Sequence, residues 1–321
     1  MKAAVYERYG PPDVVQIKDI TKPVPGPNEI LIKVYAATVN RTDCGFRYPR
    51  PFIVRFFSGL LKPKKQILGN EFAGIVEYTG SQVTLFKEGD EVFGNTGSSF
   101  GAHAEYLPVH ENSAVVLKPH NISFENAAAV CDGAMLAYNY FKVFNIKKGN
   151  SILIYGATGS IGTSAMQLAK FYGAEITAVG NTKNIELLKS LGAEDVIDYT
   201  KEDYTKIKKQ FDVIFDAVGK ISYLKCKHLI KKGGVFASTD FGPFPQNPIL
   251  ALLSAAGLTG RKVVFPLPEE SKEDNLFFKE LVEAGVFKPV IDRTYSLDEI
   301  VEAYRYVETG EKTGNVILKI V

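Results

Sequence analysis

The chain has 321 residues, a formal net charge of +2, 45% hydrophobic residues and 23% charged residues. These values fit a globular protein of about two domains, and they give no general attraction to nucleic acid or to an anionic membrane. No apolar signal segment is evident, and the longest apolar run, residues 248–258, is shorter than the ~18 residues of a membrane span and predicts a core helix. We therefore expect a cytoplasmic protein without stable membrane insertion and without a nucleic-acid partner.

The first third of the chain predicts a β-rich domain. Strand-forming residues occupy 2–6, 30–37, 71–78, 91–93, 104–109 and 114–117, and turn clusters rich in Pro and Gly separate them. Helices do not alternate regularly with these runs. We expect this domain to span residues 1–123.

After Ser123, a predicted helix N-cap, strands and helices alternate. Six predicted strands lie at 151–155, 175–179, 195–199, 211–218, 234–239 and 262–265, and the pattern is typical of a parallel sheet covered on both faces. The fold class is thus α/β, with a doubly wound, six-stranded Rossmann domain at residues 124–286. Residues 287–321 return to strand-like sequence, and we expect them to complete the first domain.

The turn after the strand at 151–155 carries glycines at every third position, Gly156, Gly159 and Gly162. A dinucleotide site needs a tight turn, then a bare backbone beside the pyrophosphate, then close packing of helix on strand. The flanking strand and helix supply the context that this motif requires. The predicted loop ligands are Gly156, Ala157, Thr158, Gly159, Ser160, Ile161 and Gly162.

The residues after the second strand bear on the choice of cofactor. NAD sites usually place Asp or Glu there, about 20 residues after the glycine loop, to hold the ribose 2′-hydroxyl. This chain has Asn181, Thr182 and Lys183 instead, so we expect no carboxylate that would repel a 2′-phosphate. The sequence predicts NADPH over NADH, although Lys183 also fits an ordinary exposed lysine.

Two further turns lie at predicted carboxyl ends of strands, where doubly wound sheets bind ligands. Their glycines also fit ordinary turns, and that alternative stays open. The remaining predicted cofactor residues are Tyr199, Ala217, Val218, Gly219, Asp240, Phe241, Phe265 and Asn315.

Four segments together resemble the medium-chain dehydrogenase/reductase superfamily: AATVNRTDCG (36–45), LGNEFAGIV (68–76), SILIYGATGSIG (151–162) and GNVILKI (314–320). The chain is most similar to the zinc-free, zeta-crystallin-like NADPH quinone oxidoreductases. The resemblance implies a GroES-like catalytic domain that the Rossmann domain interrupts and the C-terminus completes. It also implies a homodimer, with residues 262–265 as a sheet edge that needs a partner.

The same resemblance explains Glu71, a carboxylate in an otherwise apolar segment. Zinc-dependent members carry a histidine ligand at the position of Asn70 and a cysteine ligand at that of Asn40, and their third ligand falls near Asp132. Amides are poor zinc ligands, so we expect no metal, and Glu71 should pair with Arg41 or with backbone donors. Metal sets drawn from Cys44, Cys131, His103 and His110 lack ligand spacing.

Without a Lewis acid, reduction of an electrophilic acceptor is easier than oxidation of an alcohol. The sequence therefore predicts zinc-independent transfer of hydride from NADPH to a small hydrophobic quinone or α,β-unsaturated carbonyl. By resemblance, Asn40 should lie near the nicotinamide with Asp43 close by, and Tyr48 is a candidate proton donor. Asn40 also fits a simple helix cap, and Tyr48 a wall residue.

Residues 47–66 combine aromatic and aliphatic side chains with basic ones. They fit a lid over the acceptor, a membrane-surface helix, or a helix packed on the domain. Two alternative functions also stay open: a zinc-type alcohol or carbonyl dehydrogenase, and a non-catalytic NADPH-binding protein, either crystallin-like or RNA-binding. The basic residues of this segment are Arg50, Arg55, Lys62, Lys64 and Lys65.

Overall fold

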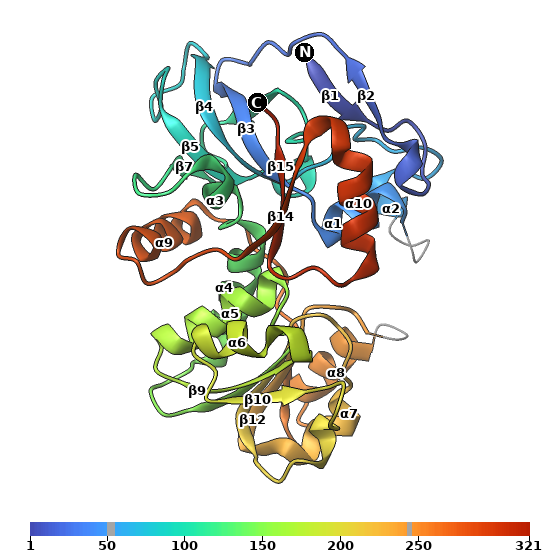
Figure 1. Ribbon diagram of the computed structural model, residues 1–321, viewed down its shortest axis with the longest axis vertical. Helices are drawn as coiled ribbons and strands as arrows, with labels where there is room; N and C mark the ends of the chain where they lie inside the picture. Colours follow the sequence, from blue (N-terminus) through green and yellow to red (C-terminus); the bar gives the residue numbers. More distant parts are fainter. Residues whose placement is uncertain (50–54, 243–245) are drawn as a thin grey trace. The chain divides into compact units, whose positions relative to one another are not determined.

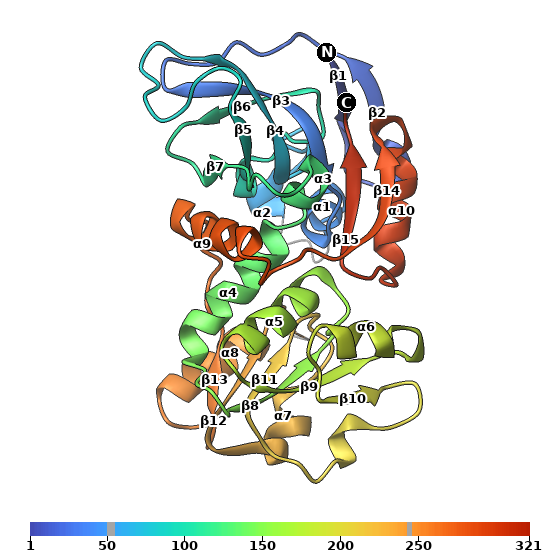
Figure 2. The ribbon, with the colours of Figure 1, turned by 60° about the vertical axis from the view of Figure 1, so that its left-hand side comes forward.

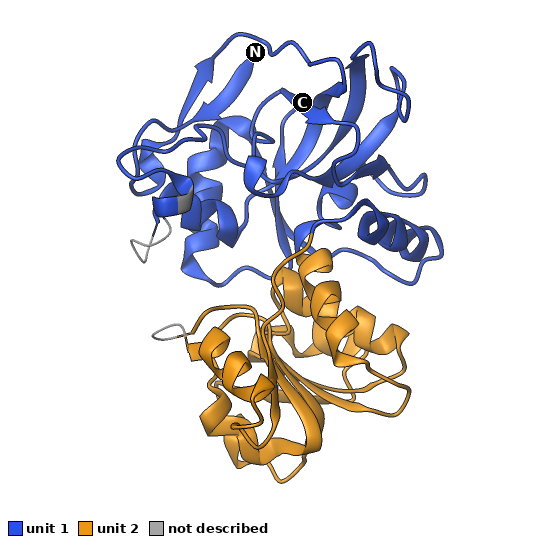
Figure 3. Cartoon of the chain, turned by 180° about the vertical axis from the view of Figure 1, so that it is seen from behind, with its two compact units in different colours: residues 1–132, 270–321 blue, residues 133–269 orange. Residues whose placement is uncertain are grey.

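The structure is a computed structural model that describes residues 1–49, 55–242 and 246–321. The chain forms two compact units (Figure 3): unit 1 comprises Met1–Asp132 and Glu270–Val321, and unit 2 comprises Gly133–Glu269. Within the described parts of the chain, no helix has the length and apolar character needed to cross a membrane.

Unit 1 is built on a largely antiparallel sheet (Figure 1). Its strand path is β14 (Ile291–Ser296), β15 (Asn315–Lys319), β3 (Glu29–Thr38), β4 (Glu71–Thr79), β5 (Glu91–Asn95) and β7 (Val115–Leu117), with β6 (Tyr106–His110) also paired to β3. In this sheet β15 runs antiparallel to β3, with Ile317 opposite Thr38. The C-terminal segment thus contributes β14 and β15 to the sheet of unit 1.

A separate ribbon pairs β1 (Lys2–Val5) with β2 (Gln16–Asp19). Strand β2 was not predicted, because its four residues carry only one apolar side chain and none of them is buried. The core of unit 1 lies instead under β3 and β4, where Ile30, Ile32 and Phe72 are fully buried.

The helices of unit 1 are α1 (Arg41–Arg47), α2 (Arg55–Ser58), α3 (Phe124–Ala128), α9 (Lys272–Glu283) and α10 (Ile300–Thr309). Ser123 caps α3 as predicted, because its hydroxyl accepts a hydrogen bond from the N–H of Asn126 at 3.3 Å. Both α3, which packs on β3 and β4, and α9, which packs on β7, belong to unit 1. These bounds differ from the predicted ones, which grouped residues 124–132 and 270–286 with the Rossmann domain.

Unit 2 contains the predicted parallel sheet of six strands (Figure 2), in the order β10-β9-β8-β11-β12-β13. Every strand overlaps its predicted segment, so the Rossmann fold class is confirmed. The strands are β8 (Ser151–Tyr155), β9 (Glu175–Gly180), β10 (Asp195–Asp198), β11 (Phe211–Asp216), β12 (Ile230–Ser238) and β13 (Lys262–Val264).

The helices of unit 2 are α4 (Asp132–Phe144, which begins on the last residue of unit 1), α5 (Ser160–Phe171), α6 (Ile185–Ser190), α7 (Tyr223–Cys226) and α8 (Gln246–Ala255). The expectation of a core helix at residues 248–258 is wrong. In α8 only Asn247 is buried, whereas Leu252 is 74% exposed and Ile249 51% exposed. Apolar composition alone does not report which side of a helix another element covers.

Candidate cofactor and active sites

The three loop glycines of unit 2 serve three separate purposes. Gly156 has φ +73°, a left-handed conformation that makes the turn after β8. A Cβ at Gly162 would lie 2.1 Å from the carbonyl oxygen of Gly156, so only glycine lets α5 approach the strand this closely. A Cβ at Gly159 would meet only that same oxygen, at 3.8 Å, so the backbone at Gly159 faces open space. This is the cradle that a pyrophosphate requires.

The N-terminus of α5 forms the other half of this cradle. Gly159 is the N-cap, and its carbonyl accepts the N–H of Thr163 at 2.8 Å. The N–H groups of the first helical turn lack partners within a helix and attract an anion together with the helix dipole. Ala157 is fully buried, so it offers only its backbone. The loop therefore fits a dinucleotide cofactor.

The loop after β9 holds the predicted phosphate ligands. Asn181 precedes a short 3₁₀ turn, Thr182–Asn184, in which Thr182 and Lys183 are exposed. The side-chain oxygen of Asn181 is buried without a hydrogen-bond partner, which suits a hydroxyl donor from a ligand.

The expectation that no carboxylate lies here is wrong. Asp198, at the end of β10, is the register partner of Gly180, and its Oδ2 accepts the hydroxyl of Thr182 at 2.5 Å. Asp198 lies 16 residues beyond Thr182 in the chain, outside the end of the second strand on which the expectation depended. Only the parallel pairing of β9 and β10 brings the two residues together.

The other predicted cofactor residues of unit 2 follow the carboxyl ends of neighbouring strands. Tyr199 is 51% exposed, and its N–H donates to the carbonyl of Gly180 at 3.0 Å, which places it beside the β9 loop. After β11, Gly219 has φ +69°, and a Cβ there would lie 2.2 Å from the Cβ of Asp240. The turns after β11 and β12 are thus packed together, with Ala217 buried and Val218 partly exposed.

Asp216 was not predicted, yet it organises these two turns. Its carboxylate accepts the N–H groups of Val218, Lys220 and Ile221 at 3.0–3.3 Å and the hydroxyl of Ser238 at 3.1 Å. Burial nevertheless raises the pKa of this carboxyl. Only a carboxylate offers the acceptor capacity that this arrangement uses.

Phe241 and Phe265 lie close together, with ring centroids 5.5 Å apart, and Phe241 is 61% exposed. Asn315 is placed differently, because it starts β15 in unit 1 and is buried there. Its amide donates to the carbonyls of Ala129 and Val290, each at 3.2 Å. The predicted cofactor residues thus lie at the carboxyl ends of the unit 2 strands, except Asn315.

The predicted catalytic residues of unit 1 lie on α1 and at its two ends. Asn40 is its N-cap and forms a capping box with Asp43. Its side-chain oxygen accepts the N–H of Asp43 at 3.1 Å, and its Nδ2 donates to Asn70 Oδ1 at 2.7 Å and to Glu71 Oε2 at 3.1 Å. Asn40 therefore acts as a cap, and it also holds the side chains of Asn70 and Glu71.

Asp43 and Tyr48 differ in access to solvent. Asp43 is fully buried, its carboxylate accepts the N–H groups of Asn40 and Gly69 at 2.9 Å, and burial raises its pKa. It holds the loop before β4 in place and does not face solvent. Tyr48 is the half-buried C-cap of α1, and its N–H donates to the carbonyl of Cys44 at 3.0 Å.

Glu71 is buried among neutral donors. Its carboxylate accepts the hydroxyl of Thr38, the amide of Asn40 and, at 2.6 Å, the N–H of Asp132. In the described part of the chain no ion pair joins it to Arg41, which is exposed, so that half of the expectation is wrong and the half naming backbone donors is right. Burial raises the pKa of Glu71.

Two titratable residues near Glu71, Asp132 and Lys312, were not among the predicted site residues. Asp132 accepts from Asn70 Nδ2 at 3.4 Å, and burial together with the charge of Glu71 raises its pKa well above the usual value. Lys312 is half-buried before β15 and donates to the carbonyl of Gly314 at 2.6 Å; loss of solvent lowers its pKa, which Glu71 counteracts. Of these two residues, only Asp132 could have been found from the sequence, because it lies near the position of the third zinc ligand in zinc-dependent relatives.

The donor set at this place does not suit zinc. The side chains that occupy the three ligand positions are two amides and one carboxyl with a raised pKa. The structure's described residues contain no group of three or more His, Cys, Asp or Glu side chains arranged to hold a metal ion. Cys44 and Cys131 are buried, and His103 is engaged with the carbonyl of Thr38 at 2.8 Å.

The segment at residues 47–66 is described except for 50–54, so Arg50 lies outside the described residues. Arg47 is fully buried, pairs with Glu308 and lies over the ring of Tyr304 at 4.9 Å. At the end of α2, Tyr9 anchors the chain through hydrogen bonds to the hydroxyl of Ser58 at 2.8 Å and to the carbonyl of Gly59 at 2.6 Å. Leu61, in contrast, is 90% exposed.

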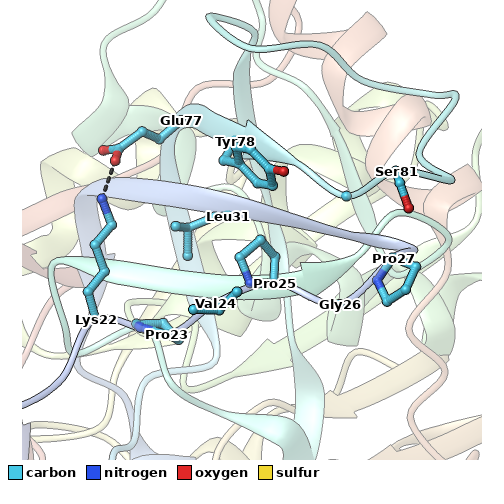
Figure 4. A pocket seen from close by; sticks show the side chains of 11 residues that line it. Lys22, Pro23, Val24, Pro25, Gly26, Pro27, Leu31, Glu77, Tyr78 and Ser81 are labelled. Atoms are coloured by element: carbon cyan, nitrogen blue, oxygen red, sulfur yellow. Dashed lines mark hydrogen bonds and ion pairs between the residues drawn. The ribbon is translucent and has the colours of Figure 1, made fainter.

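A pocket of about 520 Å³ lies elsewhere on unit 1 (Figure 4). It is formed by the Pro-rich segment 22–27 and by side chains of β3 and β4, and an ion pair between Lys22 and Glu77 closes one end. None of the predicted site residues lines it. We assign it no part in the chemistry.

Comparison with known proteins supports the fold and the family resemblance. Residues 26–120 match the alcohol dehydrogenase GroES-like domain, and residues 191–318 match the zinc-binding dehydrogenase family. A 2-methylene-furan-3-one reductase of Solanum lycopersicum is 36% identical over 331 residues, which cover 99% of this chain and 79% of the relative. An NADPH-dependent alkenal/one oxidoreductase, chloroplastic, of Arabidopsis thaliana is 34% identical with the same coverage.

The solved structure of the quinone oxidoreductase from Coxiella burnetii matches with a TM-score of 0.88 and 29% identity, covering 100% of this chain and 99% of that one. The similarity therefore extends over both units, and it confirms the resemblance that the four sequence segments carry. The chain belongs to the medium-chain dehydrogenase/reductase superfamily, in its zeta-crystallin-like branch.

Proposed function

We propose that this protein is a zinc-independent, NADPH-dependent oxidoreductase that transfers hydride to a quinone or an α,β-unsaturated carbonyl. The observation that carries the proposal is the bond between Asn40 and Asn70, 2.7 Å long, at the place where zinc-dependent relatives bind their metal. Amides that satisfy each other there leave a site without a Lewis acid. The names of the relatives, an alkenal/one oxidoreductase, a furanone reductase and a quinone oxidoreductase, support the same class of acceptor.

The unit 2 loops have defined parts in this proposal. The Gly159 backbone and the first turn of α5 hold the pyrophosphate, and the loop after β9 holds the adenosine ribose with its 2′-phosphate. Tyr199, exposed beside that loop, offers a face for the adenine ring. When bound, NADPH supplies the hydride.

In this proposal the unit 1 residues position the acceptor and stabilise the negative charge that forms on it. Reduction of a quinone or enone creates an anionic oxygen, which the protein must stabilise or protonate. Asn40 holds Asn70 and Glu71 in fixed positions, and its own amide hydrogens are engaged by them. We assign proton delivery to the hydroxyl of Tyr48, the half-buried residue that ends α1.

NADPH consumption with a quinone, an enone and a simple aldehyde tests this proposal, with and without a zinc chelator and with NADH controls. We expect chelator-insensitive turnover of the quinone or the enone, and less than 0.1 zinc per chain by elemental analysis, as an order of magnitude for a metal-free site. Turnover confined to the aldehyde and abolished by chelation would establish the zinc-type dehydrogenase instead. NADPH binding without turnover of any acceptor would favour a non-catalytic role.

We also propose a homodimer formed through unit 2. β13 is an edge strand, and the adjacent helix α8 with the turn after it exposes Ile249, Leu252 and Leu258. Leu252→Glu should shift the mass measured by light scattering from two chains to one, while Leu61→Glu, at a more exposed position in unit 1, should leave it unchanged. Cytoplasmic location stays a prediction, since the Arabidopsis relative is named as chloroplastic.

A further inference from the structure

The carboxylate of Asp198 is built into the loop that the proposed function assigns to the 2′-phosphate. Oδ2 accepts the hydroxyl of Thr182 at 2.5 Å and lies 3.5 Å from the amine of Lys201. Oδ1 accepts the N–H of Thr200 at 3.0 Å and its hydroxyl at 2.7 Å. Every one of these partners stabilises the ionised form of the carboxyl.

This arrangement fixes a negative charge at the edge of the sheet. The hydroxyls of Thr182 and Thr200 lower the pKa of Asp198 to about 2, so it is ionised at any pH used in an assay. The single hydroxyl proton of Thr182 points at Asp198, which leaves Thr182 able to accept a hydrogen bond from a ligand but not to donate one.

The two cofactors differ at this place in charge and in hydrogen bonding. The 2′-hydroxyl of NADH donates a proton, which the hydroxyl oxygen of Thr182 and the unpartnered side-chain oxygen of Asn181 both accept. A 2′-phosphate brings close to two negative charges and needs donors, which Thr182 supplies only by turning away from Asp198. The exposed amines of Lys183 and Lys201 compensate for that charge.

We propose that Asp198 limits the selectivity of this site for the 2′-phosphate. The protein then binds NADPH because Lys183 and Lys201 offset the charge of the phosphate, and it also binds NADH. The inference rests on the proposed function, because it assumes that the β9 loop holds the adenosine ribose. It goes further by naming the residue that sets the balance between the two cofactors.

The test measures dissociation constants of NADP⁺ and NAD⁺ by calorimetry at fixed salt for the wild type and for Asp198→Asn. Asparagine keeps an acceptor for Thr182 and removes the charge. The matched control is Asp195→Asn, which makes the same charge change in the same strand but at an exposed carboxylate paired with Lys209 at 3.0 Å. We expect the Kd ratio of NAD⁺ to NADP⁺ to rise about tenfold in Asp198→Asn, and to stay within about twofold in Asp195→Asn.

An unchanged or lower ratio in Asp198→Asn would overturn the inference while leaving the proposed function standing, since both cofactors would still bind. Equal increases in the two Asn variants would also overturn it, because the effect would then be one of net charge. If the wild type bound neither cofactor, the proposed function itself would fail. Should Asp198→Asn not fold, Lys201→Met decides the question: the ratio should fall at least threefold, and no change would overturn the inference.

Discussion

Gly159 and Gly162 provide a sharp test of the cofactor loop, because the structure gives them opposite roles. At Gly162 an added Cβ would lie 2.1 Å from the carbonyl oxygen of Gly156 and 2.7 Å from the Cα of Ala157, both backbone atoms that cannot move aside freely. We expect Gly162→Ala to destabilise the protein by about 1–3 kcal/mol, despite the better helix propensity of alanine.

At Gly159 the φ of −76° is accessible to alanine, and the nearest atom to its Cβ is 3.8 Å away. We expect Gly159→Ala to change the free energy of unfolding by less than about 0.5 kcal/mol. The new methyl group would nevertheless occupy the open space against which the pyrophosphate is to lie. We therefore expect NADP⁺ binding to weaken at least tenfold, or about 1.4 kcal/mol.

Denaturant unfolding and calorimetric titration with NADP⁺ measure the two effects separately. Gly45→Ala is the control, because this helical residue of unit 1 has no atom within 4 Å of an added Cβ and should change neither quantity by more than about 1 kcal/mol. Wild-type NADP⁺ affinity in Gly159→Ala would refute the assignment of the loop. Undiminished stability in Gly162→Ala would refute the close approach of α5 to the strand.

Three further predictions concern unit 1. Asn40→Ala removes the cap of α1 and one donor to Glu71, so we expect a loss of about 1–2 kcal/mol in denaturant unfolding; an unchanged midpoint would contradict the capping role. Asp132 has a raised folded-state pKa, so its contribution to stability is present at low pH and is lost as pH rises through that pKa. Asp132→Asn should accordingly gain stability over the wild type by about 1–3 kcal/mol between pH 5 and pH 8, and parallel pH profiles would contradict this. Glu308→Ala leaves the buried guanidinium of Arg47 without its carboxylate and should lower the free energy of unfolding by about 2–3 kcal/mol. This loss is smaller than for a fully buried ion pair, because Glu308 is partly exposed. In contrast, Glu302→Ala, which breaks the exposed pair with Arg305, should cost less than about 0.5 kcal/mol, and equal losses would refute the distinction.

The sequence predicted those features that depend on local patterns. The six parallel strands were found because each is a run of Val, Ile and Phe bounded by turns, and such a run reports burial on both faces. The glycine spacing predicted the loop after β8, because Gly156 makes the turn with φ +73° and Gly162 lies against the backbone of Gly156 and Ala157, all within six residues. The contact that an added Cβ at Gly156 would make with Val218, at 2.6 Å, depends on the fold and could not be read from the sequence. The start of α3 was predicted from Ser123 alone, because serine is a favoured N-cap residue.

What failed were expectations that depend on contacts distant in the chain. The apolar composition of residues 248–258 predicted a core helix, yet Leu252 is 74% exposed. Of the two partners expected for Glu71, a backbone donor is present in the N–H of Asp132, whereas Arg41 is not a partner among the residues that the structure describes. The side chains of Thr38 and Asn40, which the fold brings to the carboxylate, were not predicted. Buried polar groups find whichever donors the fold places nearby, and sequence distance does not rank them.

The sequence by itself determined the fold class, and it predicted the glycine loop at residues 156–162, because both follow from residue identity and short-range geometry. The family resemblance added the expectation that Asn40 and Asn70 stand where zinc-dependent relatives carry ligands. Only the tertiary structure decided the electrostatics of the site. The pairing of β9 with β10 set Asp198 against Thr182, and the folding of three distant segments around Glu71 raised its pKa. The physical reason is that charge interactions act through space over several ångströms, so they depend on which strands become neighbours.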